Sequence, residues 1–168
     1  MNNVLSLIKS IQEFSDGENK KPCKKVVQKL AYLIQQKNID LELDYTIHFY
    51  GPYSEDLDLE IRQLNSQGSL NIDFSNSKGH LITVAEQFFS KIELLSESAQ
   101  SIIKTFGARK PSELELIATT LYVQRELGQA SKDEISKAVI RIKGSKYPQS
   151  QINSTIDELS KNAYFSIT

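Results

Sequence analysis

The sequence has few of the residues on which many enzymes and small secreted folds depend. Cys23 is the only cysteine, so a disulfide framework and a cysteine-based zinc site are excluded, and a reducing compartment is expected. His48 and His80 are the only histidines, which leaves little material for acid–base catalysis. Glycine and proline are also scarce, at seven and four residues, and no low-complexity tract occurs. These absences favour an ordered chain of globular composition.

Long apolar runs are missing as well. No stretch approaches the length of a membrane span, and Lys9, Gln12 and Glu13 interrupt the first apolar segment before a signal-peptide core can form. We therefore expect a soluble, cytoplasmic protein with no membrane partner.

Charge of one sign is not in excess either. The formal net charge is -1, so no overall positive field attracts a polyanion, and nucleic-acid binding would need a local basic patch. The 168 residues, 39% of them hydrophobic, are enough for one domain or for two small domains that share a core.

The first half of the chain has a mixed pattern of helix and strand. Residues 3–14 and 23–37 carry apolar stripes at helical spacing, and residues 44–50 alternate as a strand does. Gly51-Pro52 is expected to end this strand, and Ser54 to cap a helix that stops near residue 67. Two alternating runs, residues 70–74 and 80–84, then predict a β-hairpin. Helix, helix, strand, helix and two-stranded wing is the order of elements in a winged helix.

Helix start signals recur through the rest of the chain. The capping-box pattern of Ser or Thr followed three residues later by Glu occurs at Thr83–Glu86, Ser112–Glu115 and Ser131–Glu134. The last two predict helices that end near Leu127 and Lys143, and a further helix is expected after residue 150.

The second half also echoes the first. Residues 61–72 and 156–167 place apolar residues at matching positions, which predicts an incomplete second winged-helix-like copy. Its final segment, residues 164–167, is expected to pair as a strand with residues 44–50. The predicted fold is mainly α with small β. A winged-helix-like domain, residues 1–106, is packed as one unit on a helical, partial winged-helix-like repeat, residues 107–168.

Two short motifs carry a resemblance to known proteins. One is a K-L-x-Y-L helix and the other a Y-G-P-Y turn before a capped helix, formed by Lys29, Leu30, Tyr32, Leu33, Tyr50, Gly51, Pro52, Tyr53 and Ser54. Through these two motifs, residues 20–72 resemble the Panacea antitoxin domain family and its YwgA-like bacterial relatives. The resemblance implies a small antitoxin or regulatory protein that binds a partner protein, such as a toxin encoded next to it, and has no enzymatic activity. The helical region after residue 107 departs from that pattern, so the partner of any one relative does not carry over.

The Y-G-P-Y stretch suggests a binding surface. If Tyr45, Ile47 and Phe49 face the core, alternation turns His48 and Tyr50 to the opposite face, beside the acidic start of the next helix. An aromatic edge next to charge of one sign is typical of protein-binding surfaces. The predicted protein-binding residues are Tyr50, Tyr53, Glu55, Asp56 and Arg62. Gly51-Pro52 itself is interpreted as a structural hinge that ends the strand and aims the next helix, so the binding surface is expected on its flanks.

DNA binding by the winged helix is the competing interpretation. The helix in the recognition position carries four acidic residues, Glu55, Asp56, Asp58 and Glu60, against Arg62 alone, and phosphates would repel it. Basic residues gather elsewhere, and the candidate nucleic-acid contacts are Lys24, Lys25, Lys29 and Lys78. A second basic cluster contains Lys137, Arg141, Lys143 and Lys146. A solvated helix face explains either cluster better, so DNA contact is the second interpretation.

Catalysis is not expected. The sequence contains no phosphate-binding loop, dinucleotide fingerprint, nucleophile elbow or H-E-x-x-H motif. Asp56 and Glu60 share a helix face, but a solvated acidic face explains them better than a carboxylate pair. We predict no enzymatic activity and no cofactor, and the sequence leaves homodimer formation open.

Overall fold

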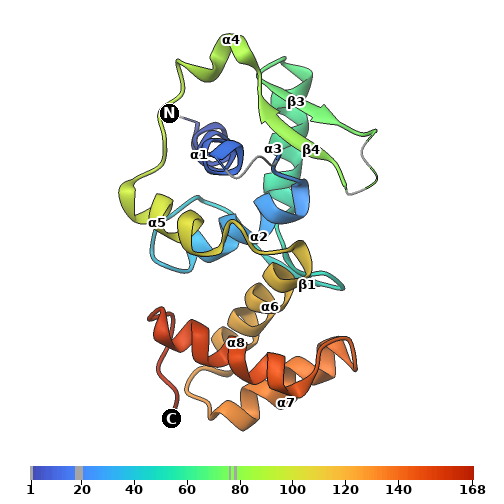
Figure 1. The fold of residues 1–168 in the computed structure, drawn as a ribbon, viewed down its shortest axis with the longest axis vertical. Helices are drawn as coiled ribbons and strands as arrows, with labels where there is room; N and C mark the ends of the chain where they lie inside the picture. Colours follow the sequence, from blue (N-terminus) through green and yellow to red (C-terminus); the bar gives the residue numbers. More distant parts are fainter. Residues whose placement is uncertain (1, 18–20, 76, 78) are drawn as a thin grey trace. The chain divides into compact units, whose positions relative to one another are not determined.

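The structure is a computed structural model, and it describes residues 2–17, 21–75, 77 and 79–168. These residues form eight helices and four short strands, and the strands make two separate two-stranded antiparallel sheets (Figure 1). The predicted class, mainly α with small β, is confirmed.

Contacts within the chain define two compact units. The first unit comprises residues 1–45 and 54–111, and the second comprises residues 46–53 and 112–168. The Y-G-P-Y hairpin thus belongs by its contacts to the second unit, although both neighbouring segments belong to the first. The predicted domains, residues 1–106 and 107–168, stay a prediction about folding units, whereas this division describes contacts.

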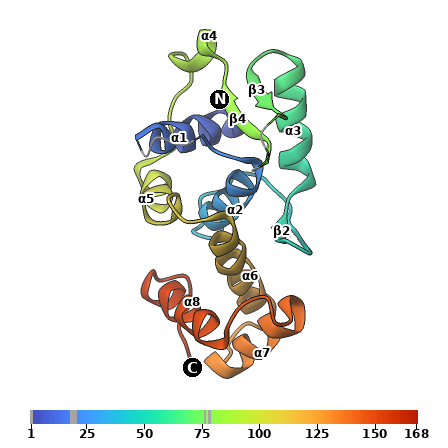
Figure 2. The same cartoon turned by 45° about the vertical axis from the view of Figure 1, so that its right-hand side comes forward.

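The first unit has the helices and the wing of the winged-helix order, but the strand expected between its second and third helices, β1 (Thr46–His48), pairs with β2 (Gly51–Tyr53) and belongs by its contacts to the second unit. Its elements are α1 (Asn3–Gly17), α2 (Lys24–Gln35), α3 (Glu55–Ser66), β3 (Leu70–Asp73), β4 (Leu81–Val84), α4 (Glu86–Phe89) and α5 (Glu97–Phe106). β3 and β4 pair from Leu70 opposite Val84 to Asp73 opposite Leu81 and form the wing. α3 packs on β3 and α1 packs on β4, as Figure 2 shows. The wing is thereby attached to the helices along both of its strands.

Helix α2 is more deeply buried than its sequence pattern predicts. Leu30 and Ile34 are in the core as the helical spacing predicts, but Gln28 and Lys29, which lie off this apolar stripe, are buried too, as is Leu33. Gln28 accounts for part of the difference, because its amide donates to the Ser54 carbonyl at 2.8 Å and accepts from the Ser54 N–H at 3.0 Å. The Ser54 hydroxyl in turn accepts from the N–H of Leu57, so its predicted role as the N-cap of α3 is confirmed.

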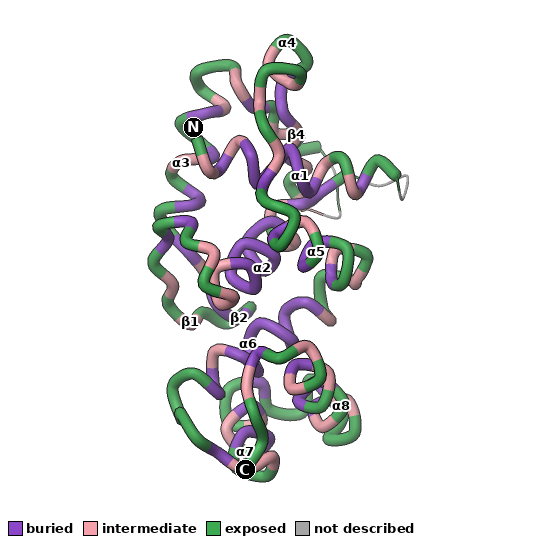
Figure 3. The backbone as a smooth tube through the Cα atoms, turned by 90° about the vertical axis from the view of Figure 1, so that its left-hand side faces the viewer, coloured by how far each residue is buried: buried purple, intermediate pink, exposed green. Residues whose placement is uncertain are grey.

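The second unit is a helical cluster with one small hairpin. It contains α6 (Pro111–Leu127), α7 (Lys132–Lys143) and α8 (Gln149–Lys161), together with β1 (Thr46–His48) and β2 (Gly51–Tyr53). Its apolar core consists of Leu116, Val123, Ala130, Ile135, Val139, Tyr147, Ile152 and Ile156. Figure 3 shows that much of α6 is buried.

Of the three predicted capping boxes, the structure forms the one at Ser131. There, the Ser131 hydroxyl accepts from the N–H of Glu134, and the Glu134 carboxylate accepts from the N–H of Ser131. Helix α4 instead begins after Ala85, without a side-chain cap. Helix α6 already begins at Pro111, so Ser112 lies inside its first turn, and Glu115 has a different role. Proline at the first helical position outweighs the capping pattern that follows it.

The prediction of a final strand at residues 164–167 is wrong. Residues 164–167 have no strand conformation, and β1 pairs with β2 rather than with the C-terminal segment. Tyr164 is nevertheless buried, and Phe165 packs against the apolar core of the second unit. The C-terminal segment is therefore attached by side-chain burial, which explains an apolar pattern that resembles a strand.

Candidate functional site: a hairpin loop braced by buried charges

The Y-G-P-Y stretch forms a minimal hairpin in the second unit. Thr46 lies opposite Tyr53, and His48 lies opposite Gly51, so that Phe49 and Tyr50 form the connecting turn. We call these two residues the aromatic loop. The prediction that Gly51-Pro52 ends a strand is therefore wrong, because this pair begins the returning strand β2.

Gly51 is required by this geometry in two ways. Its φ is +89°, while Phe49 and Tyr50 are not among the residues with positive φ. This matches hairpin loops that place a glycine in the left-handed region after the turn. In addition, a Cβ atom at this position would lie 2.7 Å from the Thr119 hydroxyl oxygen, so the backbone of β2 approaches α6 closely. Only glycine satisfies both requirements without strain.

The two side chains of the aromatic loop are exposed. Phe49 is 75% exposed and Tyr50 is 51% exposed, and their rings meet edge to face with centroids 5.0 Å apart. The prediction that Phe49 faces the core is wrong, because the chain turns at this residue and alternation ends. Tyr53 is half-buried and stacks on His48, with ring centroids 5.0 Å apart. The loop thus presents a pair of rings to solvent.

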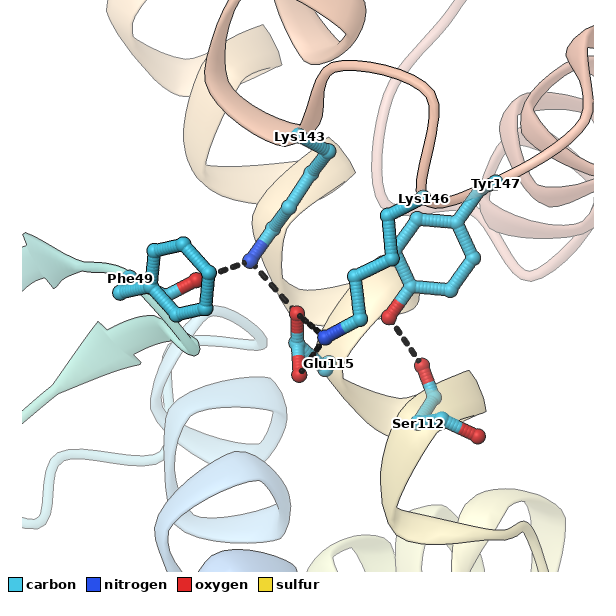
Figure 4. Close-up of polar contacts among 6 residues, drawn as sticks. All are labelled: Phe49, Ser112, Glu115, Lys143, Lys146 and Tyr147. Atoms are coloured by element: carbon cyan, nitrogen blue, oxygen red, sulfur yellow. Dashed lines mark hydrogen bonds and ion pairs between the residues drawn. The ribbon is translucent and has the colours of Figure 1, made fainter.

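Three charged residues, here called the Glu115 cluster, lie beneath the aromatic loop (Figure 4). The ammonium group of Lys143 donates to the Phe49 carbonyl and to Glu115 Oε1, both at 2.7 Å. Lys146 donates to both oxygens of the same carboxylate, at 2.8 and 3.0 Å. Lys143 therefore connects α7, α6 and the loop through one ammonium group. The loop carbonyl is held by a charge-assisted hydrogen bond, a stronger type than a neutral one.

Burial differs across the Glu115 cluster. The side chains of Lys143 and Glu115 are 2% and 7% exposed, whereas that of Lys146 is 37% exposed. Burial alone would raise the pKa of Glu115, but the hydrogen bonds and positive charges of Lys143 and Lys146 outweigh burial and lower this pKa. Nearby, burial and the negative charge of Glu115 raise the pKa of Tyr147, whose hydroxyl donates to the Ser112 carbonyl. The carboxylate therefore stays ionised and the phenol neutral at physiological pH.

The predicted protein-binding residues divide between the two units. Tyr50 and Tyr53 belong to the second unit, whereas Glu55, Asp56 and Arg62 lie on α3 of the first. Glu55 and Asp56 are exposed in the first turn of α3, where the helix dipole favours acidic side chains. Whether all five act together stays a prediction.

The candidate nucleic-acid contacts are in different surroundings. Lys25 is exposed, but Lys24 is half-buried and pairs with Asp58, which Arg62 also contacts. Asp58 is 3% exposed, so it is a buried, doubly paired carboxylate and not part of a solvated acidic face. Lys29 is buried, and Lys78 lies outside the described residues. Of the three lysines that the structure describes, Lys25 is the most exposed.

Sequence reasoning missed the Glu115 cluster. Lys143 and Lys146 were interpreted as part of a basic, solvated face, and Glu115 as a capping residue. Pro111 was the available signal: a helix that starts there places Glu115 in an otherwise apolar run, from Leu114 to Ala118, and a carboxylate in such a run needs a cationic partner. No sequence signal identifies which lysines supply it.

Two further properties limit the chemistry of the described residues. Among them, no group of three or more His, Cys, Asp and Glu side chains is arranged to hold a metal ion. None of their helices combines the length and the apolar character that crossing a membrane requires.

The fold and the braced loop define a mainly helical protein with a two-stranded wing. Comparison with known proteins found a bacterial relative. The chain is 28% identical over 119 residues to the uncharacterized protein YwgA of Bacillus subtilis (strain 168). The alignment covers 67% of this chain and 71% of that protein. No protein-family model matches the chain. The expected similarity to YwgA is therefore confirmed, while the Panacea assignment stays a prediction.

Proposed function

We propose that this protein is a cytoplasmic, non-enzymatic binding module that uses the aromatic loop to hold a partner protein. The observation that carries the proposal is the exposure of Phe49 and Tyr50 on a loop whose backbone is fixed by Lys143. Exposed aromatic side chains on a rigid support lose little conformational entropy on binding, and they are typical anchors of protein interfaces.

The Y-G-P-Y motif supports a more specific role. Its resemblance to the Panacea domain suggests an antitoxin or regulatory adaptor that neutralises a partner protein or presents it to other proteins. A toxin encoded next to this chain is the partner that this role implies. The acidic first turn of α3, with Glu55 and Asp56, would contribute a second contact in the same assembly.

Co-expression with the neighbouring gene tests this proposal. We expect the neighbour to be toxic alone, to be neutralised by this protein and to co-purify with it. Replacing Phe49 and Tyr50 by alanine should weaken the complex by about 2 kcal/mol or more, the range of interface hot spots. Phe74→Ala is the matched control, because Phe74 is also an exposed aromatic residue, 65% exposed, but lies after β3 of the first unit.

Unchanged co-purification of the Phe49 and Tyr50 variant would contradict a binding role for the loop. A harmless neighbour that does not co-purify would remove the antitoxin role.

A DNA-binding regulator is the alternative proposal, and the helices and wing of the first unit favour it. Against it, Glu55 and Asp56 start the helix in the recognition position, and Lys29 is buried. A mobility-shift titration with the protein's own upstream DNA separates the two proposals. Specific binding should be of nanomolar class and should weaken steeply with salt. No shift at low salt would exclude this alternative.

A further inference from the structure

The Glu115 cluster is not balanced in charge. Lys143 and Lys146 contribute two ammonium groups, and in the part of the chain that the structure describes, their acidic partner is the single carboxylate of Glu115. Lys143 is enclosed, with 2% of its side chain exposed, whereas Lys146 is 37% exposed. Of the two lysines, Lys146 is therefore the one that an external anion can reach.

Aromatic rings lie around the ammonium group of Lys146. Its nitrogen lies 5.5 Å from the ring centroids of both Tyr50 and Tyr147 and 6.0 Å from that of Phe49. Figure 4 shows Lys146 beside Tyr147, with its nitrogen directed at the Glu115 carboxylate. An anionic group that approaches Lys146 must place its neighbouring atoms against the aromatic loop. Those rings would also exclude water and so strengthen the new ion pair.

We propose that the aromatic loop and Lys146 together recognise an acidic segment of the partner protein. A carboxylate of the segment binds the ammonium group of Lys146, and an adjacent apolar side chain packs on Phe49 and Tyr50. This inference rests on the proposed function and specifies the chemistry of the partner. A nucleic acid fits less well, because phosphate backbones are bound by several cations along a groove, whereas this cluster supplies one excess charge.

Selection from a random dodecapeptide phage library, with the full-length protein as bait, provides a probe without knowledge of the natural partner. We expect the selected peptides to contain Asp or Glu next to Leu, Ile or an aromatic residue. The best peptide is then synthesised, and its affinity is measured by fluorescence anisotropy. An absence of acidic residues among the selected peptides would overturn the proposal.

Lys146→Gln isolates the contribution of the charge. This variant leaves Lys143 paired with Glu115 in a one-to-one ratio, so we expect it to fold, and circular dichroism melting verifies this. It should bind the peptide about tenfold more weakly, because a charge-assisted hydrogen bond is lost. Lys146→Arg should retain most of the affinity. Lys137→Gln is the matched control, since it removes an exposed charge from α7 that pairs with Asp133.

A peptide whose acidic residue is changed to the amide completes a double-mutant cycle. It should lose affinity for the wild type and lose nothing further for Lys146→Gln, and additive losses would overturn the carboxylate contact. Tighter binding of oligothymidine than of any peptide, dependent on Lys146, would also overturn it.

Comparing the Lys146→Gln variant with the variant that has alanine at Phe49 and Tyr50 separates this inference from the proposed function. If alanine at Phe49 and Tyr50 abolishes peptide binding while Lys146→Gln does not weaken it, this inference fails and the binding role of the loop stands. If alanine at Phe49 and Tyr50 leaves peptide binding unchanged, the proposed function itself fails.

Discussion

Replacing Glu115 by glutamine preserves the size of the side chain and removes its charge. Lys143, with 2% of its side chain exposed, would then lack the carboxylate that it pairs with in the wild type. Removing one partner of a buried ion pair typically costs about 3–5 kcal/mol, because the remaining charge stays desolvated. Lys146 adds little to this cost, because it is 37% exposed and water can compensate for the lost contact. We expect a loss of about 3–4 kcal/mol in the free energy of unfolding.

This loss would be a large part of the stability of an ordinary domain, which is about 5–15 kcal/mol. Urea unfolding followed by circular dichroism measures the change. Glu126→Gln is the matched control, because Glu126 is an exposed glutamate on the same helix, and the change there should stay within about 0.5 kcal/mol. A loss below about 1 kcal/mol for Glu115→Gln would refute the reasoning, since it would place Lys143 in contact with water or with another anion.

Three further expectations follow from the second unit. Gly51→Ala should lower the free energy of unfolding, measured in urea, by about 2–4 kcal/mol, because it adds a close contact with α6 to backbone strain. Gly128→Ala is the control: this glycine has φ +71° but open space around it, so the loss should be only about 1–2 kcal/mol. Because the pKa of Glu115 is lowered in the folded protein, its ionised form stabilises the fold above the ordinary glutamate pKa of about 4.3. In an acid titration the wild type should lose this stability as the pH falls below that value, and the Glu115→Gln variant should show no such loss. Tyr164→Ala should lower the melting temperature clearly, because the ring is 5% exposed, whereas deleting residues 166–168, which are exposed, should not.

The parts of the fold that were predicted correctly depend on local chemistry. The cap of α3 at Ser54 and the capping box of α7 at Ser131 use partners only three residues away. Helix α2 followed from apolar residues at helical spacing, and the wing from two alternating runs around a turn. Such signals survive in the sequence because both partners lie within one element.

The candidate site was predicted less well because its partners are distant in sequence. Lys143 contacts Phe49 and Glu115, which are 94 and 28 residues away. Lys143 and the exposed Lys137 lie on the same helix, and helical spacing alone cannot tell a buried ammonium from a solvated one. The alternation that predicted an inward Phe49 failed for a similar reason. A two-residue turn interrupts the strand, and the glycine that permits the turn was interpreted as its end.

The Glu115 cluster can be tested separately for two roles, stabilising the fold and positioning the aromatic loop. A buried ion pair does not by itself show that the pair contributes stability. Replacing such a pair by apolar residues of similar volume is often neutral or stabilising. The double variant Glu115→Leu, Lys143→Met should therefore unfold at a urea concentration close to that of wild type, in contrast to Glu115→Gln alone. It would also lose the hydrogen bond to the Phe49 carbonyl and the carboxylate that holds Lys146.

If the charges position the loop, this stable double variant should bind the partner or the selected peptide more weakly than wild type. Wild-type affinity in that variant would show that the loop keeps its conformation without the cluster. In that case, Gly51 and the packing of β2 on α6 would be sufficient to hold the two rings in place.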